Sequence, residues 1–240
     1  MTGLRTLLLA VCTLAMTLAS AHGATLQISP VMVDLPADSN ASGLTLRNPG
    51  DKPLYGQVRV YRWDQENGED TLTPTQDVVA SPPMIQIAAR SEQLVRLVRT
   101  APPPNGAEES YRVLIDELPE ADATPANGVT IRLRYSVPVF LEPGAQTGTP
   151  KLAWHLFHAG DGWELRADNT GKRRAQIAAV QLVNGAGSTF EINKGLLGYA
   201  LPGRGRTWRL PLPANADLSG QVKIRAAVNA TPAESVVSVE

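Results

Sequence analysis

The side chains that could catalyse a reaction or hold a metal ion are few in this chain. Two histidines, His155 and His158, stand in the run His-Leu-Phe-His. In an extended strand, residues three apart point to opposite faces, so this pair cannot chelate one ion from one strand. The only cysteine, Cys12, lies near the start of the chain. We therefore expect no metal site and no cofactor.

The arrangements that activate a nucleophile or cradle a phosphate are also missing. No Gly-x-Ser-x-Gly elbow occurs, and Gly203-Arg204-Gly205 lacks the third glycine of a dinucleotide loop. Asp116 and Glu117 are neighbours on an expected strand, so they face opposite ways and suit glycosidase chemistry poorly. The net charge of −1 lacks the surplus of Lys and Arg that nucleic-acid binding needs. These features indicate a binding protein that is not an enzyme, has no catalytic residues and binds no nucleic acid.

The elements that must position any binding residues read as strands nearly throughout. Short runs alternate apolar and polar residues, Gly, Pro, Asn and Asp separate them, and no long segment carries the apolar stripe of an amphipathic helix. Turn signals stand at residues 48–51 (Asn-Pro-Gly-Asp) and 66–69 (Glu-Asn-Gly-Glu). The expected strands of the first half are Leu26–Val33, Ala41–Asn48, Leu54–Trp63, Met84–Ala88, Gln93–Arg99, Tyr111–Leu118 and Val129–Leu141. Those of the second half are Leu152–His158, Trp163–Asn169, Arg174–Val183, Phe190–Ile192, Thr207–Leu212, Gln221–Val228 and Val236–Glu240.

This pattern predicts an all-β protein of two tandem immunoglobulin-like β-sandwiches. Each series of strands has the size of one such sandwich, and residues 142–150, rich in Gly and Pro, separate the two. We expect a signal peptide over 1–23, a first domain over 24–143, a linker over 144–150 and a second domain over 151–240. The four tryptophans, Trp63, Trp154, Trp163 and Trp208, are interpreted as core or cleft residues.

The first 23 residues are typical of a secretory signal peptide. Arg5 precedes an apolar run that is too short to span a bilayer permanently, and small residues follow it. Cleavage after residue 21 and cleavage after residue 23 both fit. The remaining chain has no cysteine and no long apolar run, so we expect an exported protein without disulfides or membrane insertion.

The segment over residues 127–143 carries the sharpest binding signal. Val129, Ile131, Leu133 and Tyr135 share one face of an extended strand, and polar residues, including Arg132 and Arg134, share the other. Such alternation is ordinary for a half-buried strand. It also suits a strand whose edge completes the sheet of another protein, because free backbone groups beside an apolar row form a template for β-augmentation.

Several segments together resemble the periplasmic pilus chaperones of the chaperone–usher pathway, the PapD-like family. They are the first strand over 26–33, the Pro82-Pro83 turn with the strand over 91–99, the strand over 109–119 that ends in Leu-Pro, the strand over 129–143, and the second-half runs 166–171 and 201–208. The resemblance covers nearly the whole chain after the signal peptide.

The resemblance implies two immunoglobulin-like domains in a boomerang arrangement, acting in the periplasm. Such a chaperone lends its seventh strand to a pilus subunit that lacks one, which is donor-strand complementation, and passes the subunit to an outer-membrane usher. By position, Val129, Ile131 and Leu133 would be the donated residues, with Tyr135 extending the row. Whether the free protein self-associates to cover this edge stays open.

The chain departs from the best-known members at the residues that hold the subunit's terminal carboxylate. Pro30 and Pro138 stand at those positions, and neither can bind a carboxylate. Glu142 replaces an Arg before the linker proline, which leaves the family's usual inter-domain ion pair without its basic member. Such divergence resembles the archaic, Csu-type branch. Because a desolvated carboxylate needs a complementary charge, we expect Arg112 or Arg134 to supply the anchor.

Two other functions fit the sequence less well. A secreted immunoglobulin-like adhesin or surface-binding module would carry its ligand residues on loops, whereas the motifs here lie on strands. A hydrolase on a sandwich scaffold would need a nucleophile with its base, and no such motif occurs.

Overall fold

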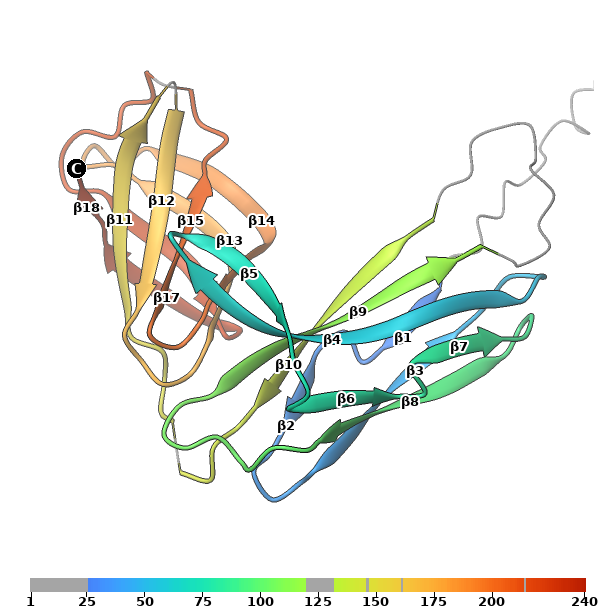
Figure 1. Ribbon diagram of the computed structural model, residues 1–240. Helices are drawn as coiled ribbons and strands as arrows, with labels where there is room; N and C mark the ends of the chain where they lie inside the picture. The colour runs from blue at the N-terminus through green and yellow to red at the C-terminus, as the bar shows by residue number, and fades with distance from the viewer. Residues whose placement is uncertain (1–25, 120–131, 146, 161, 214) are drawn as a thin grey trace, which may run out of the picture.

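The computed structural model describes residues 26–119, 132–145, 147–160, 162–213 and 215–240. Within these ranges every regular element is a strand, so the all-β prediction is confirmed. No helix capable of crossing a membrane occurs in this part of the chain. The strands form four sheets, which make two sandwiches that meet at an angle (Figure 1).

The first sandwich consists of strands β1–β10. One sheet has the order β1-β3-β8-β6, and the other has the order β2-β10-β9-β4-β5, with β7 also paired to β4. The bounds are β1 Gln27–Ser29, β2 Val33–Leu35, β3 Ala41–Arg47, β4 Leu54–Glu66, β5 Glu69–Pro74, β6 Val78–Ser81, β7 Met84–Ile87, β8 Glu92–Arg99, β9 Glu109–Leu118 and β10 Arg134–Leu141. Leu44 and Val95 of one sheet meet Ile115 and Val139 of the other in a fully buried core.

The second sandwich consists of strands β11–β18. Its sheets have the orders β15-β12-β11-β18 and β14-β13-β16-β17. The bounds are β11 Leu152–Ala159, β12 Gly162–Asn169, β13 Ala175–Val183, β14 Thr189–Ala200, β15 Arg204–Arg209, β16 Lys223–Val228, β17 Thr231–Val236 and β18 Ser238–Val239. Leu156, Leu165, Ile177 and Leu182 are among its fully buried core residues.

The first strand differs from its prediction. The apolar residues over 26–33 predict one strand, but the chain forms β1 in one sheet and β2 in the other. β1 pairs antiparallel with β3, whereas β2 pairs in parallel with β10. The chain therefore crosses between the sheets at residues 30–32, next to the strand on which the binding prediction rests.

Three further strands were not predicted. β5 and β17 are exposed on nearly every residue, and β6 has only four residues. Apolar alternation marks a strand only when one of its faces is buried, so these edge strands leave little pattern in the sequence.

Both predicted turns are present. At the first, the buried Asn48 side chain donates to the carbonyls of Lys52 and Ile87 and accepts from the Gly50 N–H, which ties the loop to the sandwich. At the second, Asn67 and Gly68 adopt φ values of 53° and 79°, the positive pair that a tight two-residue hairpin requires.

Candidate functional site

β10 has an open edge along its first half. It pairs antiparallel with β9 over its whole length, Arg134 to Leu141. On its other side, β2 covers only Val139–Leu141. Among the described strands, nothing pairs with that side of residues 134–138, so an extended chain could be added there.

The direction of the backbone groups on this edge follows from one hydrogen bond. The Glu117 N–H donates to the Leu133 carbonyl at 3.1 Å, so odd-numbered residues direct their backbone groups toward β9. Even-numbered residues direct theirs to the open side. The free groups therefore belong to Arg134, Ser136 and Pro138, and Pro138 offers a carbonyl but no N–H.

The side chains of β10 separate into two rows. Val137, Val139 and Leu141 point into the core of the first sandwich, and Tyr135 packs against that core at its margin. The Tyr135 hydroxyl donates to Glu117 at 3.2 Å, and burial together with this carboxylate raises the pKa of Tyr135 to about 12. Leu133 continues the row with 36% of its surface exposed. The remaining predicted donor residues, Val129 and Ile131, lie outside the described residues.

Arg134, on the other row, has an acidic partner within the same sheet. Its Nε donates to Asp116, which also accepts from Arg59 at 2.5 Å. Burial alone would raise the pKa of Asp116, but the hydrogen bonds from both arginines outweigh burial and hold the pKa below its usual range. Arg134 thus has a carboxylate partner inside the protein, which it shares with Arg59.

Further along the same face, a cleft of about 560 Å³ lies between the two sandwiches. Residues from both sandwiches line it, including Met32, Trp63, Arg112, Pro138, Tyr199 and Trp208. Arg112 and Pro138 are direct cross-strand neighbours on β9 and β10. The cleft therefore begins where the open edge of β10 ends.

Arg112 is the distinctive charge of this cleft. Its guanidinium carbon lies 3.7 Å from the centre of the Trp63 ring and 5.7 Å from that of Tyr199. Burial lowers the pKa of Arg112, while Asp70 and Tyr199 oppose this at longer range. Arg112 forms no ion pair with a carboxylate of the described residues, unlike Arg134. A partly desolvated cation held by aromatic rings can accept an anion from another molecule.

A buried ionic cluster fixes the wall behind the cleft and joins the two sandwiches. Arg174 bonds to Glu108 at 2.5 Å and to Asp34 at 2.6 Å, and stacks 3.7 Å above the Phe140 ring. Burial raises the pKa of Glu108 because the loss of water outweighs the attraction of Arg174. Nearby, Glu142 pairs with Arg173 at 3.4 Å. Glu142, which replaces the family's arginine before the linker proline, therefore still forms an ion pair between the two sandwiches.

The hairpin of β4 and β5 forms a second bridge. It leaves the first sandwich and reaches β15 of the second (Figure 1). The Gly68 carbonyl accepts from the Thr207 N–H at 3.0 Å. Gln65 donates to the Tyr199 carbonyl at 2.8 Å and accepts from the Leu201 N–H at 2.9 Å. The sequence predicts the turn of this hairpin but does not indicate that the hairpin contacts the second sandwich.

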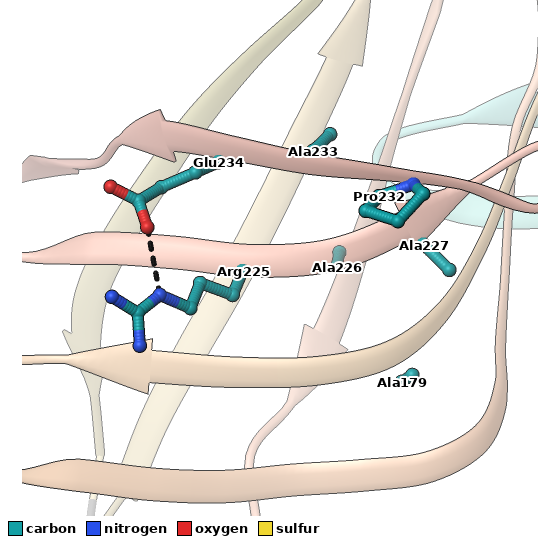
Figure 2. A pocket seen from close by; sticks show the side chains of 7 residues that line it. All are labelled: Ala179, Arg225, Ala226, Ala227, Pro232, Ala233 and Glu234. Carbon is teal, nitrogen blue, oxygen red and sulfur yellow. Dashed lines mark hydrogen bonds and ion pairs between the residues drawn. The ribbon is translucent and has the colours of Figure 1, made fainter.

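Another hollow, of about 480 Å³, lies on the second sandwich over β13, β16 and β17 (Figure 2). Its floor carries only Ala and Pro side chains. Its two charged side chains neutralise each other, because Arg225 donates to Glu234 at 2.7 Å. It offers neither a free charge nor an aromatic surface, so we place the candidate site at the β10 edge and the cleft.

The residues first considered for chemistry lie apart. His155 is within 3.0 Å of Glu240 and 3.6 Å of Asp168, while the ring of His158 packs edge-on against Trp163. Within the described ranges, no group of three or more metal-ligating side chains gathers. The tryptophans lie in the core or the cleft, as expected: Trp63, Trp154, Trp163 and Trp208.

The chain is similar to known proteins both in sequence and in fold. Residues 25–146 match the family of pili and flagellar-assembly chaperones through its PapD N-terminal domain. No curated protein matches the chain.

Three solved structures show the likeness in fold. A complex of the CsuC chaperone with the CsuE tip subunit, from archaic Csu pili of Acinetobacter baumannii, shares 23% identity at a TM-score of 0.70, covering 90% of this chain and 100% of that one. The SafB chaperone with the SafA pilin of Salmonella enterica shares 21% at 0.61, covering 90% and 95%. The E. coli chaperone DraB shares 20% at 0.60, covering 90% and 97%.

Proposed function

The chain belongs to the family of pili and flagellar-assembly chaperones, and on that premise we propose that it captures pilus subunits in the periplasm by donor-strand complementation and delivers them to an outer-membrane usher. The observation that carries this proposal is the open edge of β10, which ends at a cleft with an unbalanced arginine. An unpaired strand edge is unfavourable in a free protein unless it serves to pair with another chain.

This edge would supply a subunit that lacks one strand with backbone hydrogen bonds and with apolar side chains. The backbone groups of Arg134 and Ser136 would pair with its sheet, and the row ending at Leu133 would fill its core. Each apolar side chain buried in this way contributes about 1.5–3 kcal/mol. The register would be fixed, because a shift by one residue would place Arg132 and Arg134 in the subunit's core.

Of the two expected anchors, we propose Arg112 for the subunit's terminal carboxylate. Arg134 is exposed and already paired with Asp116, whereas Arg112 lies in the cleft and forms no ion pair with the described residues. A hydrogen bond to a charged group contributes about 1.5–3 kcal/mol, so its loss corresponds to roughly 10- to 150-fold in affinity.

The first experiment tests the donated edge by co-expression with a pilus subunit. The variant carries Ile131→Asp and Leu133→Asp together, and the matched control carries Leu94→Asp, an equally drastic change at a leucine that is 56% exposed on the opposite sheet. We expect the wild type and the control to co-purify with the subunit one to one, and the edge variant to fold, by circular dichroism, without retaining it. Retention by the edge variant would overturn the proposal.

The second experiment tests the anchor by measuring the affinity of the subunit for three variants. Arg112→Ala should weaken subunit binding by roughly 10- to 150-fold. Arg112→Lys should recover part of the lost affinity because it keeps the charge, and Arg134→Ala should change the affinity less than about threefold. Equal effects of the two alanine variants would assign the anchor elsewhere.

A further inference from the structure

We propose that the cleft between the sandwiches is also a side-chain pocket that selects a large apolar residue at the C-terminal end of the captured chain. This inference rests on the proposed function and deepens it, because it names a chemical property of the client. It also assigns the selecting wall to the second sandwich, chiefly to Leu196 of β14.

β2 limits the path that a guest strand can take along β10. β2 already occupies the open side of β10 from Val139 onward, and it runs parallel to β10. A guest strand on the same side must therefore stop before Val139. Pro138 has no N–H to offer and marks the same limit. A guest strand that runs parallel to β10, as β2 does, then ends with its carboxyl group beside Pro138, whose cross-strand neighbour is Arg112.

Arg112 gives the end of that path a positive charge. A chain that ends at this point brings a carboxylate to Arg112, the cation that the described residues leave unpaired. The other charges of the cleft are already satisfied: Asp70 accepts from Gln65 at 2.9 Å, and Arg206 pairs with Glu69 at 2.8 Å. A charged final side chain would thus lose water without gaining a partner.

The cleft that contains Arg112 also has an apolar wall. Val31 from the first sandwich and Leu196 from the second are 77% and 50% exposed, and both line the cleft. Leu197 and Trp208 continue this wall on the second sandwich. An apolar side chain at the end of a guest strand would cover these residues, and a small or charged one would leave them in water.

An irregularity of β14 places the leucines at the cleft. Leu196 pairs with Ala178 and Gly198 with Ile177, so Leu197 is an extra residue in the strand, a β-bulge. Gly198 adopts a φ of 157°, and a Cβ at that position would lie 2.9 Å from the Trp208 ring nitrogen. The bulge and the close approach of Trp208 thus depend on a glycine at 198.

The test uses fluorescein-labelled 12-residue peptides of alternating valine and threonine that end in Phe, Leu, Gly or Asp, with a Phe-amide peptide as a fifth probe. Their dissociation constants are measured for the wild type, for Leu196→Asp, for Leu196→Ala and for the exposed control Leu94→Asp. We expect the wild type and the control to bind the Phe and Leu peptides at least tenfold more tightly than the Gly and Asp peptides. Leu196→Asp should reduce this ratio to about twofold or less, with Leu196→Ala between the two.

Equal binding of all four acids, a preference that Leu196→Asp leaves unchanged, or no binding of any peptide at 1 mM would overturn this inference. None of these results decides the proposed function, which depends on subunit capture by the β10 edge. If Leu196→Asp loses the preference for apolar C-terminal residues but still captures the subunit, the result supports both the pocket and the proposed function.

Discussion

Replacing Arg174 by Met should destabilise the protein strongly, because it leaves a buried carboxylate without its counter-charge. The side chains of Arg174 and Glu108 are only 6% and 1% exposed, and they meet at 2.5 Å. Breaking such a buried pair by removing one partner costs about 3–5 kcal/mol. For a chain of this size that corresponds to a fall in melting temperature of roughly 6–20 °C, provided that the joined sandwiches unfold together.

A double-mutant cycle separates the lost charge from lost packing. Glu108→Gln in the Arg174→Met background should recover at least half of the loss, because a neutral amide needs no counter-charge when buried. The matched control is Arg204→Met. It breaks the exposed pair with Asp64, which also joins the sandwiches, and should cost less than about 1 kcal/mol.

The pH supplies a second readout for Arg174→Met. Burial already raises the pKa of Glu108, and the loss of Arg174 should raise it further. A carboxyl with a raised pKa in the folded state is penalised when ionised, so the penalty declines as the pH falls through that pKa. Urea unfolding, followed by tryptophan fluorescence, should therefore show a larger loss for Arg174→Met at pH 7 than at pH 5. A loss below about 1 kcal/mol at pH 7, or no recovery in the double variant, would refute this account of the cluster.

Two further predictions concern the bridge that the β4–β5 hairpin forms. Gly68→Ala should lower the melting temperature more than Gly106→Ala does: both glycines have positive φ, but a Cβ at 68 would lie 2.5 Å from the Thr207 hydroxyl, whereas one at 106 meets nothing within 4 Å. Equal shifts in a calorimetric scan would show that the hairpin contact contributes nothing. Asp64→Asn should lower stability at pH 7 by at most about 1 kcal/mol and leave it unchanged near pH 2. The bond from Arg204 lowers the pKa of Asp64, so its contribution is complete above the unfolded pKa of about 4 and is lost as the pH falls through the folded pKa. A difference between Asp64→Asn and wild type that persists at pH 2 in urea titrations would contradict this assignment.

The sequence predicts the strand content well because most strands here have one buried face. Apolar alternation then reports the core directly, as it does for Val137, Val139 and Leu141 on β10. Strands exposed on both faces, such as β5 and β17, leave no such pattern. The split of the first strand between two sheets is not predicted, because the apolar residues on both sides of Pro30 read as one strand and carry no information on which partner each part pairs with.

The candidate site was predicted in part. The sequence places Arg112 near the cleft, and the structure agrees. The sequence could not favour Arg112 over Arg134 as the carboxylate anchor, because that choice depends on Asp116, which pairs with Arg134 across the sheet. The ion pairs of Arg173 and Arg174 with residues of the first sandwich join positions far apart in the chain. Such contacts depend on how two sandwiches are oriented, and local pattern does not encode that orientation.

The docked hairpin limits how the two sandwiches can move relative to each other. Its first strand, β4, is a direct neighbour of β9, which in turn carries Arg112 and supports β10. Any opening or closing of the two lobes would have to detach the hairpin tip from β15 as well as break the buried ions. The two sandwiches are therefore held in one fixed arrangement, and under the proposed function the captured subunit is the partner that has to change shape.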